Sequence, residues 1–120
     1  MIETIILNAL SEGLNVQGET PAVPVLMEIP EEKPATYVVL DKTGSQRSNH
    51  IDRATFAVQS IAPSLYEAAT LNEQVKAVMD QLPYLTEAVF AAELNGDYNF
   101  TDAETKERRY QAVYIITYKE

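Results

Sequence analysis

The residues that could do chemistry lie beside the single histidine of the chain. His50 is followed by Asp52 and Arg53, and a histidine paired with a carboxylate can act as a general base. The surrounding segment is polar and offers no recognisable nucleophile, since no Gly-x-Ser-x-Gly sequence occurs anywhere in the chain. We therefore interpret His50 as an exposed residue at the end of a strand and predict no catalytic residue.

A second group of polar residues has the composition of a cation site. It consists of Asp97, Asn99, Thr101, Asp102 and Glu104. A calcium loop also needs a glycine after the third ligand and a bidentate glutamate at its twelfth position, where this chain has Arg108. The chain has no cysteine for a thiolate zinc site, and its four glycines form neither a P-loop nor a dinucleotide fingerprint. We predict no metal and no cofactor.

Length and charge limit the classes of protein that remain. A chain of 120 residues fits one domain, spanning residues 1–120, with a single core. Its apolar runs are too short to span a membrane, and the first residues lack the basic flank of a signal peptide. The net charge of −9 argues against wrapping duplex DNA, although it suits a surface that nucleic acid must pass without sticking.

The element that must position the others is an amphipathic helix predicted for residues 64–82. Ser64, followed three residues later by Glu67, forms a capping box, while Pro63 and Pro83 bound the segment. Its apolar residues recur at helical spacing on one side: Leu65, Ala68, Leu71, Val75, Val78, Met79 and Leu82. A stripe this wide predicts a helix that covers an apolar sheet face.

The remaining pattern predicts a short helix over residues 2–14, capped by Gly13, and then strands on both sides of the central helix. Residues 15–24 are expected to form a loop, and residues 42–52 a long hairpin loop or two frayed strand ends. A tight turn is expected at Asn95-Gly96, and the final strand is expected to be central. The predicted strands are 25–29, at a sheet edge, 36–41, 53–61, 88–94 and 110–118. The fold class is therefore α+β, a mainly antiparallel sheet of four to five strands with two helices packed on one face, in the order α-β-β-β-α-β-β.

Aromatic residues outside the predicted core favour an association role. Tyr66 projects from the polar side of the central helix, while Tyr98 and Phe100 lie in a polar segment. Such side chains are enriched at protein interfaces. The basic residues between 106 and 109 lie among glutamates and are expected to form a solvated turn. The candidate interface residues are Arg47, His50, Tyr66, Tyr98, Phe100 and Arg108.

Nearly the whole chain, most closely residues 34–118, resembles the tail-terminator, or tail-to-head joining, family of long-tailed bacteriophages. The resemblance lies in the order of non-catalytic stretches rather than in any one motif. The matching stretches are PATYVVL at 34–40, DRATFAVQS at 52–60, YEAA at 66–69 with Val75, DYNFTD at 97–102 and YQAVYIITY at 110–118. The segment between Val25 and Pro34 matches least.

The resemblance implies a structural virion protein without catalytic activity. It would assemble into a ring, typically a hexamer, on the head-proximal end of the tail tube, where it stops tube growth and meets the head-tail connector protein. Its partners would be other copies of itself, the tail tube protein and the connector, and DNA would pass through the ring without specific binding. It would be made in the cytoplasm of a bacterial host and would reside in the virion tail.

Two other hypotheses stay open. The chain could be a different neck or tail component, such as a head-tail adaptor or a tube subunit, and a tube subunit would form filaments. It could instead be a small α+β enzyme or ligand-binding domain that works around His50, Asp52 and Arg53, in which case His50→Ala should abolish ligand binding.

Overall fold

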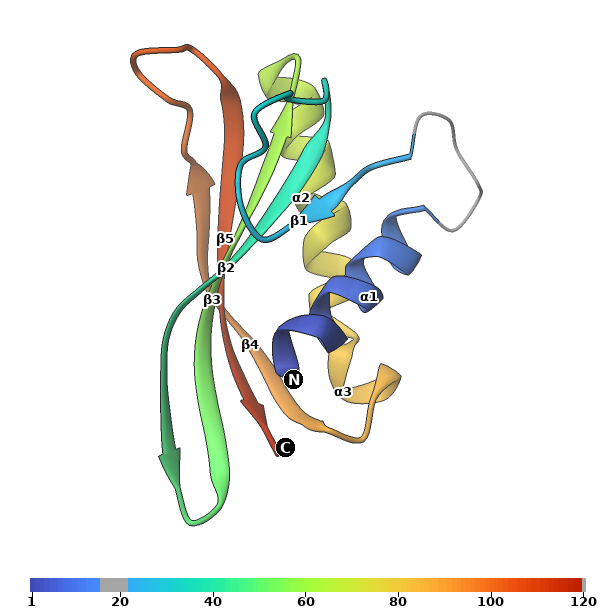
Figure 1. The fold of residues 1–120 in the computed structure, drawn as a ribbon, viewed down its shortest axis with the longest axis vertical. Coiled ribbons are helices and arrows are strands. Elements are labelled where there is room, and N and C mark those ends of the chain that lie inside the picture. Colours follow the sequence, from blue (N-terminus) through green and yellow to red (C-terminus); the bar gives the residue numbers. More distant parts are fainter. Residues whose placement is uncertain (16–21, 120) are drawn as a thin grey trace.

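The computed structural model of the chain, which describes residues 1–15 and 22–119, contains a five-stranded sheet with helices packed on one face (Figure 1). The predicted α+β class and the order α-β-β-β-α-β-β are confirmed, with one short extra helix after the central one. Most of the predicted loop over residues 15–24 falls outside the described residues. The elements are α1 (Ile2–Leu14), β1 (Val25–Leu26), β2 (Tyr37–Ser48), β3 (Ile51–Ala62), α2 (Leu65–Asp80), α3 (Leu82–Leu85), β4 (Val89–Asn99) and β5 (Arg108–Tyr118).

The strands lie in the order β1-β2-β3-β5-β4. Only β1 is parallel to its neighbour, and the other three pairings are antiparallel. β1 lies at an edge, as its flanking prolines predict, because a proline cannot donate to a strand ladder. β5 lies between β3 and β4, which confirms that the last strand is central.

Alternation along the two central strands separates a helix-covered face from an open face. The even-numbered residues of β3 and β5, among them Phe56, Val58 and Tyr114, join α1 and α2 in the main core. On the open face, Tyr37, Val39 and Ile61 form a smaller cluster against Leu26. The consecutive apolar residues at the start of β2 are therefore buried because both sides of the sheet are covered at that level.

α2 begins at its predicted N-cap. The Ser64 hydroxyl accepts a hydrogen bond from the Glu67 backbone N–H (3.2 Å) and donates one to the Glu67 carboxylate (3.0 Å). The helix buries the predicted side over most of its length, from Ala68 to Met79. It therefore covers the sheet as the stripe predicts.

Gly13 has a different role from the predicted helix cap. α1 ends at Asn15, whose φ of −120° is not left-handed and whose side-chain amide donates to the Ser11 carbonyl (2.8 Å). Gly13 lies inside the last turn, where an added Cβ would be 2.5 Å from the Cγ2 atom of Val78 on α2. The glycine is therefore needed for the close approach of the two helices.

We expect Gly13→Ala to lower the free energy of unfolding by about 1 kcal/mol, because the overpacking cost exceeds the gain in helix propensity. In a Val78→Ala background the clash is gone, so the same change should raise stability. Urea unfolding of the four proteins in this cycle measures the coupling. Equal effects of Gly13→Ala in both backgrounds would contradict the assigned role.

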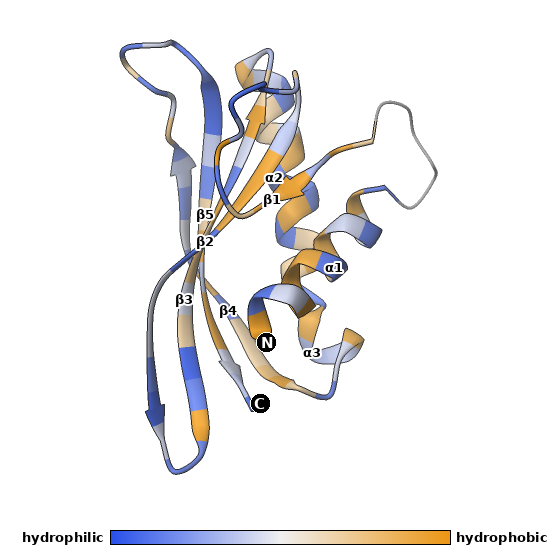
Figure 2. Cartoon of the chain, viewed as in Figure 1, coloured by the Kyte–Doolittle hydropathy of each residue, from blue (hydrophilic) through white to orange (hydrophobic). Residues whose placement is uncertain are grey.

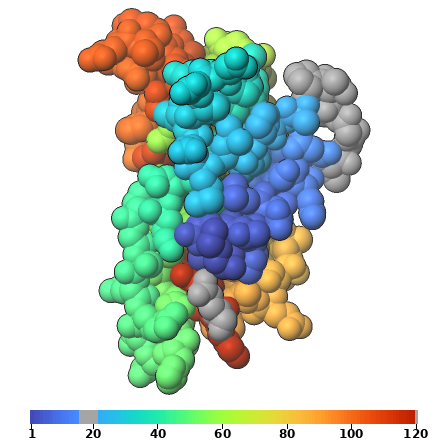
Figure 3. Space-filling model, viewed as in Figure 1, coloured from blue at the N-terminus to red at the C-terminus, as the bar shows by residue number. Residues whose placement is uncertain are grey.

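Regular strand replaces two predicted features, namely the hairpin loop or frayed strand ends over residues 42–52 and the tight turn at Asn95-Gly96. The polar residues after Asp41 continue β2, and a two-residue turn at Asn49 and His50 (φ 53° and 67°) leads into β3. β4 continues through Asn95 and Gly96, where the register shifts and Gly96 adopts a φ of +143°, so a bulge replaces the expected turn. The first of these segments projects as a hairpin beyond the helices (Figure 3).

Candidate interaction surfaces

The outer part of the β2–β3 hairpin is exposed along β2, whereas Asp52 and Ala54 of β3 are buried. Every residue of β2 from Asp41 to Ser48 is exposed, and Ile51 and Arg53 are exposed on β3. In Figure 2 this lower hairpin is largely hydrophilic, with one hydrophobic segment near the turn. β3 pairs with β5 as far as Asp52, so only residues 48–51 extend past the sheet. The exposed length of β2 from Asp41 to Ser48 is better explained by contacts outside the chain than by the core.

The hairpin is held in shape by a cross-strand ion pair. The Arg47 guanidinium donates to both oxygens of Asp52, at 2.7 Å and 3.1 Å, and the two residues are directly opposite in register. This bond lowers the pKa of the Asp52 carboxyl below its ordinary value. Asp52 is thus engaged by Arg47. His50 forms the turn, and Arg53 lies on the opposite face of β3, so these three residues are not grouped as a catalytic site.

We expect His50→Gly to raise the free energy of unfolding by about 0.5 to 1 kcal/mol, because glycine adopts the left-handed conformation of this turn without a Cβ penalty. His50→Ala keeps the Cβ and is the matched control. Urea unfolding compares the two variants. A glycine variant no more stable than the alanine variant would contradict the expectation.

The loop between β4 and β5 is folded back onto the open face of the sheet. Backbone hydrogen bonds join Phe100 N–H to the Arg109 carbonyl (2.8 Å) and Asp102 N–H to the Glu107 carbonyl (3.1 Å). The Asp102 carboxylate accepts from the N–H groups of Glu104 and Thr105, which lower its pKa. The loop is therefore closed by its own backbone.

Arg109 anchors this loop. The expectation that the basic residues form a solvated turn is therefore wrong for Arg109. Its side chain is only 9% exposed and donates to Gln59 (3.2 Å), Asp102 (3.3 Å) and Glu107 (3.1 Å). Its guanidinium also lies 5.8 Å from the centre of the Phe100 ring. Arg109 is buried because the strand register places it on the open face directly under the loop, whereas its neighbour Arg108 is exposed.

Further hydrogen bonds extend this network across the open face. The Tyr37 hydroxyl donates to Glu107 (3.1 Å), and burial together with that carboxylate raises the pKa of Tyr37 to about 12. Gln59 donates to Gln111, which in turn donates to the Tyr98 hydroxyl. Sequence reasoning missed this network because its members are far apart along the chain.

The structure divides the six candidate interface residues between the two ends of the sheet. Arg47 and His50 belong to the hairpin. The other four lie at the opposite end, since Ala62 pairs with Arg108 and α2 starts directly after Ala62. Of these four, Tyr66 is 82% exposed, and the rings of Tyr98 and Phe100 meet edge-to-face with their centres 6.0 Å apart. The molecule is 43 Å along its longest axis, so the two sets form separate surfaces.

The cation site considered from the sequence is not assembled. Asp97 faces α2, where it accepts hydrogen bonds from Asn72 (2.8 Å) and Lys76 (2.9 Å). The bond from Lys76 lowers the pKa of the Asp97 carboxyl. Asp102 is held in the loop by Arg109. Among residues 1–15 and 22–119, no three acidic or histidine side chains are grouped to hold a metal ion.

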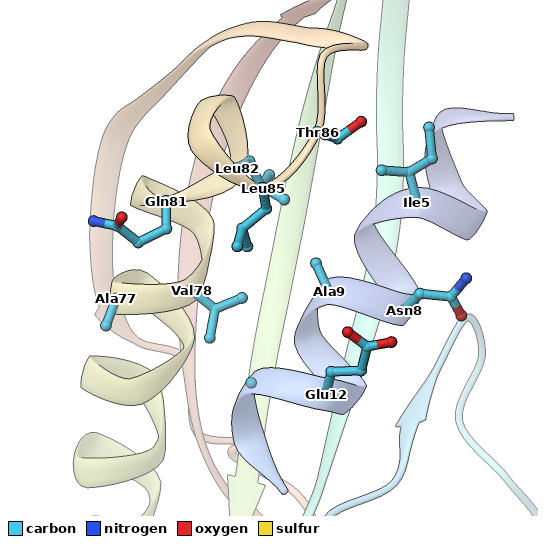
Figure 4. A pocket seen from close by; sticks show the side chains of 11 residues that line it. Ile5, Asn8, Ala9, Glu12, Ala77, Val78, Gln81, Leu82, Leu85 and Thr86 are labelled. Carbon is cyan, nitrogen blue, oxygen red and sulfur yellow. The ribbon is translucent and has the colours of Figure 1, made fainter. Parts of the chain in front are cut away.

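A groove between α1 and the α2–α3 pair was not predicted. It encloses about 600 Å³. Figure 4 shows Ile5, Ala9 and Glu12 of α1 facing Val78 and Leu85. The groove is mostly apolar and Glu12 is its one titratable side chain, so we assign it no catalytic role. Gly13 lies at the end of the groove where α1 approaches Val78 of α2.

No family model matches this chain, and no curated protein matches it. Within the described part of the chain, none of the helices has the length and apolar character needed to cross a membrane.

Proposed function

We propose that this chain is a structural virion protein of the tail-terminator kind, which assembles into a ring at the head-proximal end of a phage tail tube. The resemblance implies that the ring is a hexamer. The observation that carries the proposal is the β2–β3 hairpin, a regular projection with exposed residues on both faces. A ring requires one surface of a copy to meet a different surface on the next copy, and an exposed hairpin can supply one of the two. The resemblance described from the sequence supplies the tail-tube context.

The two-ended distribution of exposed residues supports contacts with more than one partner. One end of the sheet carries the hairpin, and the other carries exposed aromatic residues around Tyr66 and Phe100. We propose that these ends serve contacts with further copies, the tail tube protein and the head-tail connector protein. The charge of −9 supports passage of DNA through the ring without specific binding.

The test is the mass of the purified protein across concentration, combined with negative-stain images of any large species. The proposal expects closed rings of uniform size, and addition of purified tail tubes should place one ring at one tube end. Filaments of indefinite length would instead identify a tube subunit. Protein that neither forms rings nor binds tube ends would overturn the proposal.

The enzyme hypothesis gains no support from the geometry. Asp52 is occupied by Arg47, and His50 lies in an exposed turn and does not line the open pocket formed by its neighbours Gln46, Asn49 and Arg53. No observation of the site favours a second candidate function.

A further inference from the structure

The hairpin and a second exposed surface lie at the same level of the sheet, on its two opposite edges. Arg47 pairs with Asp52, Asp52 with Tyr118, and Tyr118 with Val89, so one row of residues crosses the sheet from β2 to β4. β1 pairs only with the first part of β2 and does not reach this row. Both edges are therefore open at the level of the hairpin.

The second surface, which we call the α3–β4 patch, is apolar and acidic. It consists of Tyr84, Leu85, Phe90 and Leu94, together with Glu87 and Glu93. All four apolar side chains are exposed, Tyr84 to 83%. Figure 1 shows α3 and the start of β4 on the side of the molecule away from the hairpin. Exposed apolar side chains on an edge strand are a feature that a folded protein normally covers.

The charges of the two surfaces are complementary. Residues 42–53 contain three basic residues and one acidic residue. Lys42 pairs with Glu3 of α1 and Arg47 with Asp52, so Arg53 is the cation that the hairpin presents, while residues 77–105 contain no basic residue. Among the described residues, Arg53, Glu87 and Glu93 form no ion pair. The hairpin also carries one exposed apolar side chain, Ile51, at 42% exposure. The hairpin thus offers a cation and an apolar side chain to the carboxylates and apolar side chains of the patch.

We propose that the basic hairpin of one copy docks on the α3–β4 patch of a second copy, with Ile51 against Tyr84 and Phe90, and Arg53 facing Glu87 and Glu93. The inference rests on the proposed function, since it names the contact that would build the ring. Two different surfaces on opposite edges form a heterologous contact, which repeats around an axis until the ring closes. Opposite charge adds specificity and speeds encounter.

Cysteine cross-linking tests the contact directly, because the chain has no native cysteine. An Ile51→Cys protein is mixed with Tyr84→Cys protein or with Tyr66→Cys protein and oxidised. Tyr66 is the matched control, since it is 82% exposed on a helix at the other end of the sheet. We expect the 51–84 heterodimer to form at least about tenfold faster than the 51–66 heterodimer, the ratio equivalent to about 1.4 kcal/mol. Equal rates would overturn the inference.

A charge exchange supplies an independent measurement. Arg53→Glu in the Ile51→Cys protein should slow the 51–84 cross-link, and Glu87→Arg with Glu93→Arg in the Tyr84→Cys protein should restore its rate. Failure of this restoration would also count against the contact. Rings that assemble without a preferred 51–84 cross-link would leave the proposed function intact and refute only this inference. A preferred cross-link that builds filaments would support the contact and refute the terminator function.

Discussion

Arg109→Ala is expected to lower the free energy of unfolding by about 2 to 3 kcal/mol, because it removes charge-assisted hydrogen bonds from a nearly buried site. Asp102 and Glu107 would then face each other without the cation between them. The loop over residues 100–107 should loosen from the open face of the sheet. Urea unfolding measures the loss of stability, and hydrogen exchange at the Phe100 and Asp102 amides measures the release of the loop.

The adjacent Arg108 provides the control. It is exposed, so Arg108→Ala should change stability by less than about 0.5 kcal/mol. Loss of the surface formed by Tyr98 and Phe100 is expected only in the Arg109 variant, since Arg109 lies against Phe100. Similar losses in the two variants would show that the network of Arg109 does not anchor the loop.

This network also shows where prediction from the sequence reaches its limit. The buried stripe of α2 and the central position of β5 were predictable, because each follows from local periodicity and apolar content. The burial of Arg109 depends on Gln59, which is 50 residues away, and on a loop that folds over the strand. No local pattern distinguishes Arg109 from Arg108 until the register between β3 and β5 is known.

The regular strand pairing of the predicted hairpin was missed for a related reason. Strand prediction relies on alternation between a buried and an exposed face, and β2 has no such alternation from Asp41 to Ser48, where every residue is exposed. The Asn95-Gly96 pair was misread as a turn because a bulge needs the same backbone freedom at Gly96. The α3–β4 patch was missed because apolar residues on a short helix and an edge strand look like core residues in sequence. The elements were thus predictable where burial shapes the sequence, and the candidate surfaces were not.

Trimming the hairpin is expected to have the largest effect on assembly. Deletion of Arg47, Ser48, Ile51 and Asp52 leaves the turn between Gln46 and Arg53, which are already opposite each other in register. The shortened protein should remain folded, since most of the deleted residues are exposed. Its self-association should weaken by about a hundredfold or more, equivalent to about 2.8 kcal/mol. Sedimentation across concentration measures this change.

The His50→Gly protein is the control for the trimmed one, because it changes the turn but keeps the length and charge of the hairpin. It should associate like the unmodified chain. A contact made by the sides of the hairpin would be weakened only in the trimmed protein. A contact made by its tip would be weakened in both variants. Association that is unchanged in the trimmed protein would mean that the projection makes no contact between copies, and the ring would then have to be built from the aromatic end of the sheet.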